Sequence, residues 1–224
     1  MRYEEARLAE ALTEEQSWEA EGVVVLTASV SLPQLAGGGG RAKRFNRYYR
    51  RLCRAYFSYC RQVLLPEAAE ALRAAMAVSA PWSVSRAELR HTIALRAGEV
   101  LSVVCDSREQ CSGKADFLLR RSEVWDLTVG LPMPIEEFFP PRKRCKKALV
   151  RFAREETLRR LERGEAVPRE NWRSALRRAL DLRSFYLTPE GLCFFYPMYA
   201  VGPDILTFTM PYDDENGPFP PTEA

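Results

Sequence analysis

The sequence has few of the residues from which catalytic and metal sites are built. It contains a single histidine, His91, so any Ser-His-Asp or Cys-His site would have to use it. Its neighbours Arg90 and Thr92 do not suggest a triad, and a structural or surface role is the better interpretation. The six cysteines form no C-x-x-C pair, and G-x-S-x-G, S-x-x-K and phosphate-loop patterns are absent. We therefore expect no catalytic residues, no metal and no cofactor.

Long apolar runs are also missing. No stretch reaches the roughly 18–20 apolar residues that cross a bilayer, and the acidic segment 1–15 lacks the basic start and apolar core of a signal peptide. These absences predict a soluble, cytoplasmic protein, extracytoplasmic only if an N-terminal segment is missing. The irregularly spaced cysteines lie in apolar or helical patterns, which indicates reduced, largely buried thiols.

What the sequence does contain is a mixture of strand and helix patterns. Segment 22–32 (GVVVLTASVSL) is β-branched and alternates as a strand does. Segment 41–65 has apolar residues at three- and four-residue steps, which predicts a long helix. We expect its apolar face to consist of Tyr48, Leu52, Tyr56, Tyr59 and Val63.

The remaining patterns complete an α+β fold. Residues 2–12 suit either a helix or an edge strand. Further strands are expected at 83–95, 100–105, 117–129, 185–187, 192–196 and 205–210, and further helices at 67–77, 143–163 and 168–180. This order predicts antiparallel sheet packed against several helices.

Charge is unevenly distributed, although the formal net charge is only +3. Residues 41–63 include eight basic and no acidic side chains, and Arg47, Arg51 and Arg54 mark the polar face of the predicted helix. Together with nearby tyrosines they resemble a surface that follows phosphates and stacks bases. A solvated basic face is the simpler interpretation, and contact with nucleic acid or another polyanion is the alternative. Asp126 and Asp204 lie at expected turns, where Asp commonly caps backbone N–H groups.

The C-terminal strands are unusually rich in aromatic residues. Packing against the helices is the simpler interpretation of this set. Alternation places part of it outside the core, and the alternative is an exposed recognition surface, for which Tyr196 and Tyr199 are the candidates. The set consists of Phe185, Tyr186, Phe194, Phe195, Tyr196 and Tyr199.

Two C-terminal stretches resemble a known bacterial family. Residues 123–130 (EVWDLTVG), followed by 131–139, look like a strand ending in an aromatic-Asp-Leu turn and leading into an acidic-Phe-Phe helix start. Residues 185–203 and the closing FTMPY at 208–212 are similar to the end of the family called domain of unknown function 3298.

The N-terminal part resembles the usual companion of that family, domain of unknown function 4163. The resemblance rests on Ser-Leu-Pro-Gln-Leu at 31–35 and on Phe45-Asn46. It implies a companion-like module over residues 1–112, a C-terminal module over 113–213 that shares a core with it, and a flexible tail over 214–224.

The two modules together form the extracellular part of RsiV-type anti-sigma factors, which bind lysozyme, and they also occur beside a peptidoglycan deacetylase domain. The family usually has a Gly-Gly-Ala-His turn where this chain reads Cys111-Ser112-Gly113-Lys114-Ala115. The resemblance therefore implies the fold and a binding role, without lysozyme as the partner.

The sequence thus predicts a non-enzymatic ligand- or protein-binding domain whose partner is an unknown protein or an anionic ligand. One alternative is nucleic-acid or polyanion binding through the basic helices. The other is a cell-wall glycan hydrolase acting through paired carboxylates.

Overall fold

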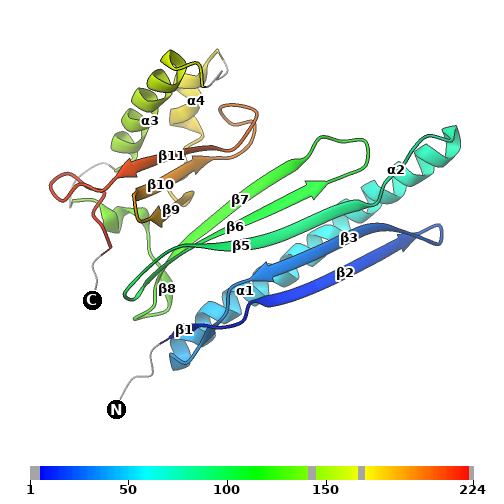
Figure 1. Cartoon of the computed structure of the whole chain (residues 1–224), viewed down its shortest axis with the longest axis horizontal. Coiled ribbons are helices and arrows are strands. Elements are labelled where there is room, and N and C mark those ends of the chain that lie inside the picture. The colour runs from blue at the N-terminus through cyan, green and yellow to red at the C-terminus, as the bar shows by residue number, and fades with distance from the viewer. Residues whose placement is uncertain (1–5, 141–144, 166–169, 222–224) are drawn as a thin grey trace. The chain divides into compact units, whose positions relative to one another are not determined.

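The protein combines helices with antiparallel and mixed sheets, which confirms the α+β class (Figure 1). The structure is a computed structural model that describes residues 6–140, 145–165 and 170–221. The chain forms two compact units, one of Met1–His91 with Cys105–Leu118 and the other of Thr92–Val104 with Leu119–Ala224. Three long strands contribute residues to both units, whereas the boundary between residues 112 and 113 stays a prediction. No helix in the described part of the chain is long and apolar enough to span a membrane.

In the first unit a helical connection joins two parallel strands. β3 pairs antiparallel with β2 and parallel with β5. Because parallel neighbours need a crossover connection, the chain between β3 and β5 passes through two helices, which run along β2 and β3 (Figure 1). The elements are β1 (Arg7–Leu8), β2 (Leu12–Ala20), β3 (Val23–Leu32), β4 (Leu35–Ala36), α1 (Gly39–Tyr59), a π-helical turn (Cys60–Leu64), α2 (Leu65–Val78), β5 (Ser85–Ala97), β6 (Val100–Gln110) and β7 (Phe117–Asp126).

Strand β2 was not predicted. Its sequence, LTEEQSWEA, contains three glutamates, and most of its side chains are exposed. It is the first strand in the order β2-β3-β5-β6-β7-β8, so only one of its edges is paired. An edge strand with two solvated faces gives a weak alternating pattern, because its side chains need not be apolar on either side.

Helix α1 begins at a glycine turn with a defined conformation. Gly38 has φ 61°, and a Cβ there would lie 2.8 Å from the Cβ of Ala6, so only glycine fits this turn without strain. Asn46 then ties the helix to β4, since its Oδ1 accepts from the Leu35 N–H and its Nδ2 donates to the Leu35 carbonyl, both at 2.8 Å.

The predicted apolar face of α1 was only partly right: Tyr56 is buried as expected, but the buried row is shifted by about one residue. Tyr59 and Val63 are 37% and 41% exposed. The prediction followed the largest side chains, whereas a parallel row that includes small residues makes the contact with the sheet. The buried residues of α1 and the π-helical turn are Ala42, Phe45, Tyr49, Cys53, Tyr56, Phe57, Cys60 and Leu64.

The π-helical turn joins α1 to α2 without a break. Pro66 lies in the first turn of α2, the helix predicted at 67–77. In a straight α-helix its ring would clash with the carbonyl of Gln62, and the wider π-helical turn, which ends at Leu64, relieves that contact.

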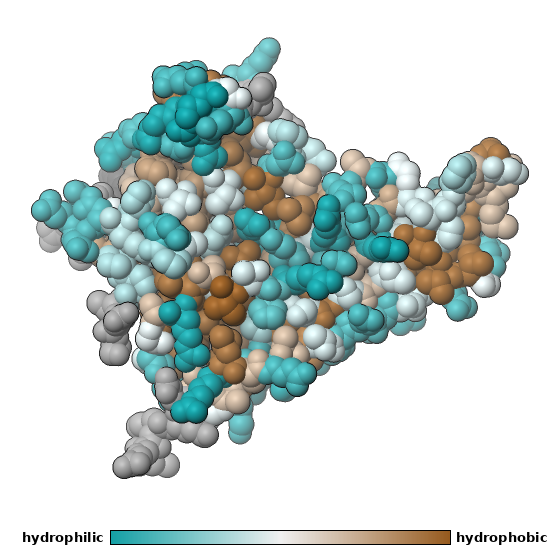
Figure 2. All heavy atoms as spheres, in the orientation of Figure 1, coloured by the Kyte–Doolittle hydropathy of each residue, from teal (hydrophilic) through white to brown (hydrophobic). Residues whose placement is uncertain are grey.

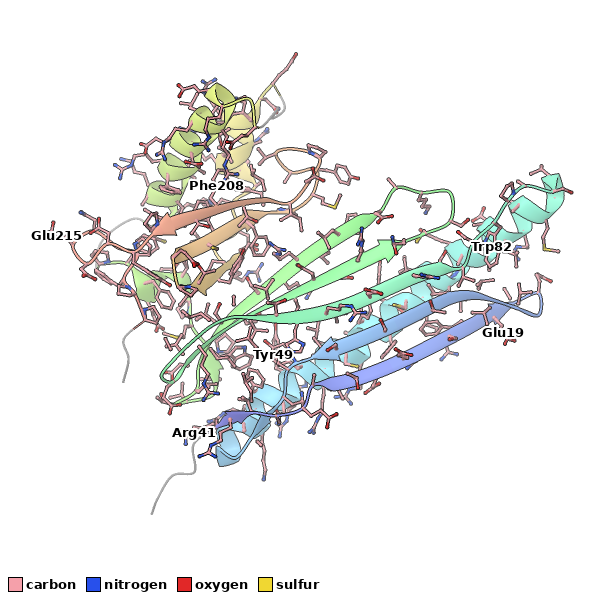
Figure 3. The ribbon with its side chains drawn as sticks, in the orientation of Figure 1. Glu19, Arg41, Tyr49, Trp82, Phe208 and Glu215 are labelled. Carbon is pink, nitrogen blue, oxygen red and sulfur yellow. The ribbon has the colours of Figure 1, made fainter. Side chains whose placement is uncertain are left out.

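In the second unit, helices cover a small antiparallel sheet of order β11-β10-β9. Figure 1 shows α3 and α4 beside this sheet. Phe208, labelled in Figure 3, is fully buried and stacks on Phe194 with ring centroids 5.4 Å apart. The elements are β8 (Leu131–Pro132), a 3-10 turn (Ile135–Phe138), α3 (Cys145–Glu162), α4 (Trp172–Arg178), β9 (Phe185–Thr188), β10 (Gly191–Tyr196) and β11 (Leu206–Pro211).

The start of the expected flexible tail is held by backbone hydrogen bonds. The Asp213 N–H donates to the Pro218 carbonyl at 2.9 Å, and the Phe219 N–H donates to the Phe138 carbonyl at 2.7 Å. Gly217 and Pro218 are buried. Residues 213–219 therefore fold back onto the 3-10 turn, and an apolar sequence pattern could not show this because the contacts are made by the backbone.

Candidate functional site: a basic cleft beside an edge strand

The strongest candidate site is a cleft of about 810 Å³ in the first unit. One wall is made by Leu12 and Glu14 of β2, and the other by Asn46 and a row of basic residues on α1. The row consists of Lys43, Arg47, Arg50 and Arg54. In a helix, residues three and four apart share a face, so this 4-3-4 spacing places all four cations along one side of α1.

The four cations are exposed and are not neutralised by the protein itself. Within the described residues none of them takes part in an ion pair. Glu14 supplies the one carboxylate of the lining. The cleft therefore has a formal charge of +3, which attracts anions and is screened by salt.

One buried thiol lies next to the cleft residue Glu14 without being part of the lining. Cys53 lies near Glu14, and burial, followed by the negative charge of Glu14, raises the pKa of its thiol to about 11. All six cysteines are free thiols and five are buried, which agrees with the expected burial. A thiol with a raised pKa is a poor nucleophile at neutral pH.

The structure brings together only part of the predicted binding set. Arg47 and Arg54 line the cleft, whereas Arg51 is exposed on α1 but lies outside the lining. Lys43, Arg50 and Glu14 were missed. A helical projection of the charges would have shown the row of Lys43, Arg47, Arg50 and Arg54, but Glu14 could be placed only after β2 was known to be a strand.

One of the two candidate tyrosines is buried, and the other is half-exposed. Tyr196 is fully buried, and its hydroxyl donates to the Leu176 carbonyl at 3.0 Å, so its interpretation as an exposed recognition residue is wrong. The alternation argument failed because both faces of β10 are covered: all six of its residues are buried. Tyr199 is 49% exposed, in a turn with φ 64°.

The tyrosines of α1 do not form a stacking surface. Tyr49, labelled in Figure 3, is 1% exposed and Tyr56 is 7% exposed, and Tyr48 is half-buried. Base stacking needs an accessible ring face. Tyr59 is 37% exposed but does not line the cleft, so within the cleft the resemblance to a nucleic-acid surface rests on its charges.

A second group of ionisable residues lies where α1 and α2 meet β6. The Tyr59 hydroxyl donates to Glu109 Oε2 at 3.2 Å. Burial, and then the charge of Glu67, raises the pKa of the Glu109 carboxyl. Glu67 is exposed and pairs with Lys114 at 2.8 Å. Neither carboxylate lines the basic cleft, and the arrangement is that of a buried acid satisfied by a tyrosine.

The other predicted polar residues have structural partners. His91 Nδ1 donates to the Ser31 carbonyl at 2.9 Å. Asp126 Oδ1 accepts from the N–H of Thr128 at 2.7 Å, the capping role expected of a turn aspartate. In the described part of the chain no group of three or more His, Cys, Asp or Glu side chains could hold a metal ion.

An apolar patch lies at one end of the first unit. Figure 2 shows apolar residues near the β2–β3 turn and the C-terminal end of α2. Val23, Met76 and Val78 are 44%, 63% and 74% exposed there. Nothing in the described residues identifies what would cover this patch.

Solved structures with a similar fold belong to the DUF3298 family. A member from Bacteroides fragilis aligns with a TM-score of 0.64 and 11% sequence identity, covering 95% of this chain and 92% of its own. A member from Pseudomonas aeruginosa aligns with a TM-score of 0.55 and 11% identity, covering 93% of this chain and 92% of its own. No family model matches the sequence, and no curated protein matches it. At this identity the likeness shows the fold alone.

Proposed function

We propose that the chain is a non-enzymatic binding module and that the basic cleft between β2 and α1 receives an anionic partner. The observation that carries the proposal is the row of four exposed cations in a concave site. A cleft lined by one sign of charge concentrates ligands of the opposite sign and speeds their association.

The fold supports the same proposal. The chain has the fold of DUF3298 family structures, and we extend this to an RsiV-like arrangement with an N-terminal module like domain of unknown function 4163. In that arrangement the fold serves as a binding module. The identity of the partner does not carry over, so the proposal includes the class of ligand and not lysozyme.

A non-enzymatic role is consistent with the side chains of the site. Of the residues that the structure describes, four cations and one carboxylate line it. His91 and Asp126, which sequence alone would test first for catalysis, have structural hydrogen-bond partners. The hydrolase alternative needs two carboxylates flanking a substrate, and among the described residues Glu14 is the one carboxylate that lines the cleft.

Binding of anionic probes to charge-reversed variants tests the proposal. Fluorescence polarisation at low salt would use labelled octaglutamate and a labelled oligodeoxythymidylate. We expect R47E/R50E/R54E to weaken binding roughly 30-fold, since each exposed charge contributes about 0.7 kcal/mol. The matched control R73E/R121E/R177E reverses three exposed arginines outside the cleft.

Both triple variants change the net charge by the same amount. The pair therefore separates the effect of the cleft charges on binding from the effect of the net charge of the protein. At single-residue level, R50E and R51E are neighbours on α1, and only R50E removes a cleft residue. The proposal is wrong if neither probe binds at low salt, or if the two triple variants weaken binding equally.

A further inference from the structure

The cleft lies at the open edge of a sheet. β2 is the first strand of the six-stranded sheet and pairs with β3 on one side. Among residues 6–140, 145–165 and 170–221, no strand pairs with its other edge. Along such an edge every second residue presents an unpaired N–H and C=O, which can accept an additional strand.

The two faces of β2 have different surroundings. Leu12 and Glu14 line the basic cleft, and the ring of Trp18 lies 6.4 Å from Phe57 of α1. Successive side chains of a strand point to opposite faces, so Thr13 and Glu15 lie on the far side. There they border a smaller hollow of about 280 Å³, which is also lined by Ser29, Val30, Ser31 and Arg90 and which Glu14 shares with the basic cleft.

The spacing of the cations suits the repeat of an extended chain. Lys43 to Arg54 is eleven residues of helix, about 16 Å, in steps of roughly 4.5 and 6 Å. Same-face residues of a strand are about 6.6–6.8 Å apart, so three of them cover roughly 13 Å. A strand added to β2 would lie about 4.8 Å from it, with alternate side chains on the α1 side.

Charge then decides which side chains such a strand would carry. On the α1 side it would meet four cations and one carboxylate. On the far side it would meet Glu15, and the nearby Arg90 is already paired with Glu88 at 3.0 Å. Acidic residues are therefore favoured on one face of the added strand and disfavoured on the other, because like charges on neighbouring strands repel.

We propose that the anionic partner is an extended peptide segment of another protein, with acidic residues at alternate positions, that adds to the open edge of β2. Its acidic side chains face Lys43, Arg47, Arg50 and Arg54. This inference rests on the proposed function and narrows it to one class of ligand. No tyrosine is among the described residues that line the cleft, which favours a peptide over a single-stranded nucleic acid that needs stacking surfaces.

Two isomeric peptides test the alternation. One is a capped octapeptide of alternating Glu and Thr, and the other has the same composition as four Glu followed by four Thr. We expect the alternating peptide to bind at least about tenfold more tightly, because only it matches both faces of β2. R50E abolishes this preference and R51E preserves it. E14Q removes the carboxylate of the cleft and tightens binding of the alternating peptide about threefold.

Backbone pairing is tested with two N-methylated forms of the alternating peptide. One is methylated at every Glu nitrogen and the other at every Thr nitrogen. In an added strand only one of these sets donates to β2, so one form loses binding and the other retains it. Equal binding of the two isomers, or equal binding of the two methylated forms, overturns the inference.

The same assay separates this inference from the proposed function. If the octapeptides fail but oligodeoxythymidylate binds and R50E weakens that binding, the cleft is an anion site and the peptide inference is wrong. If R50E affects no anionic probe, both are wrong.

Discussion

Helices α1 and α3 are both rich in arginine, but they use it differently. At the end of α3, Arg159, Arg160 and Arg163 converge on Glu156 at 2.8, 3.2 and 3.4 Å. On α1 the cleft cations have no such partner in the described part of the chain. A count of basic residues therefore does not measure binding capacity, because cations that the protein pairs internally are unavailable to a ligand.

The two candidate tyrosines also differ in whether the protein itself uses their polar group. Replacing the buried one should have the largest effect on stability. Y196F removes the hydroxyl that satisfies the buried Leu176 carbonyl. We expect the free energy of unfolding to fall by about 1–2 kcal/mol. Y199F, at a half-exposed turn position, should change it by less than about 0.5 kcal/mol. Urea denaturation measures both, and equal effects would contradict the assignment of Tyr196 to the core.

Removing an arginine of α3 should lower stability, whereas removing an arginine of the α1 row should weaken binding. The Arg160 guanidinium lies 4.9 Å from the centre of the Phe208 ring and donates to the Thr207 carbonyl at 3.1 Å. We expect R160A to lower the free energy of unfolding by about 1 kcal/mol without changing binding of octaglutamate. R50A should do the reverse. Thermal unfolding and polarisation on the same samples check the pair, and a loss of stability in R50A would count against it.

Removing Glu156, the carboxylate that the α3 arginines share, should make α3 more like α1 in its ability to bind anions. E156Q leaves Arg159 and Arg160 without their carboxylate, while Arg163 keeps its pair with Glu165 at 2.7 Å. Placed in the R47E/R50E/R54E background, it should raise the affinity for octaglutamate by up to about fivefold, the worth of an exposed ion pair. If affinity does not rise, pairing within α3 is not what keeps that helix from binding anions.

Some of the elements behind this contrast can be predicted from the sequence, and others cannot. The β-branched run of β3 and the periodic segment of α1 are visible in the sequence because burial requires apolar side chains there. β2 and the parallel pairing of β3 with β5 are not visible, because one is an exposed edge and the other depends on distant residues. Arg47 and Arg54 could be found from their helix, but the cleft also needs Glu14 from β2, and that proximity is a tertiary contact.

The smallest expected effect concerns a carboxylate that, unlike Glu156, forms no ion pair with an arginine in the described part of the chain. Burial raises the pKa of Glu109 above its usual 4.5 in the folded protein. The folded state therefore binds more protons than the unfolded state between the two pKa values, and stability falls as pH rises through that interval. E109Q removes this dependence. Its free energy of unfolding should equal that of the wild type well below pH 4.5 and exceed it at neutral pH.

Denaturant titrations across this pH range check the sign. A variant that is less stable than the wild type at neutral pH would show that the Tyr59–Glu109 hydrogen bond outweighs the burial of the carboxyl. The contrast with the exposed Glu67, which is paired with Lys114, can be sharpened with E67Q, for which no comparable gain is expected.

The most direct test of the account is a titration of the isotope-labelled protein with the alternating Glu-Thr octapeptide, followed by amide chemical shifts. If the peptide adds to β2 and faces the α1 cations, the perturbations are confined to the cleft, along Leu12–Ala20 of β2 and residues 43–54 of α1. The amides of α3 and α4 are unchanged. Perturbations centred on the arginines of α3, or none at low salt, would contradict it.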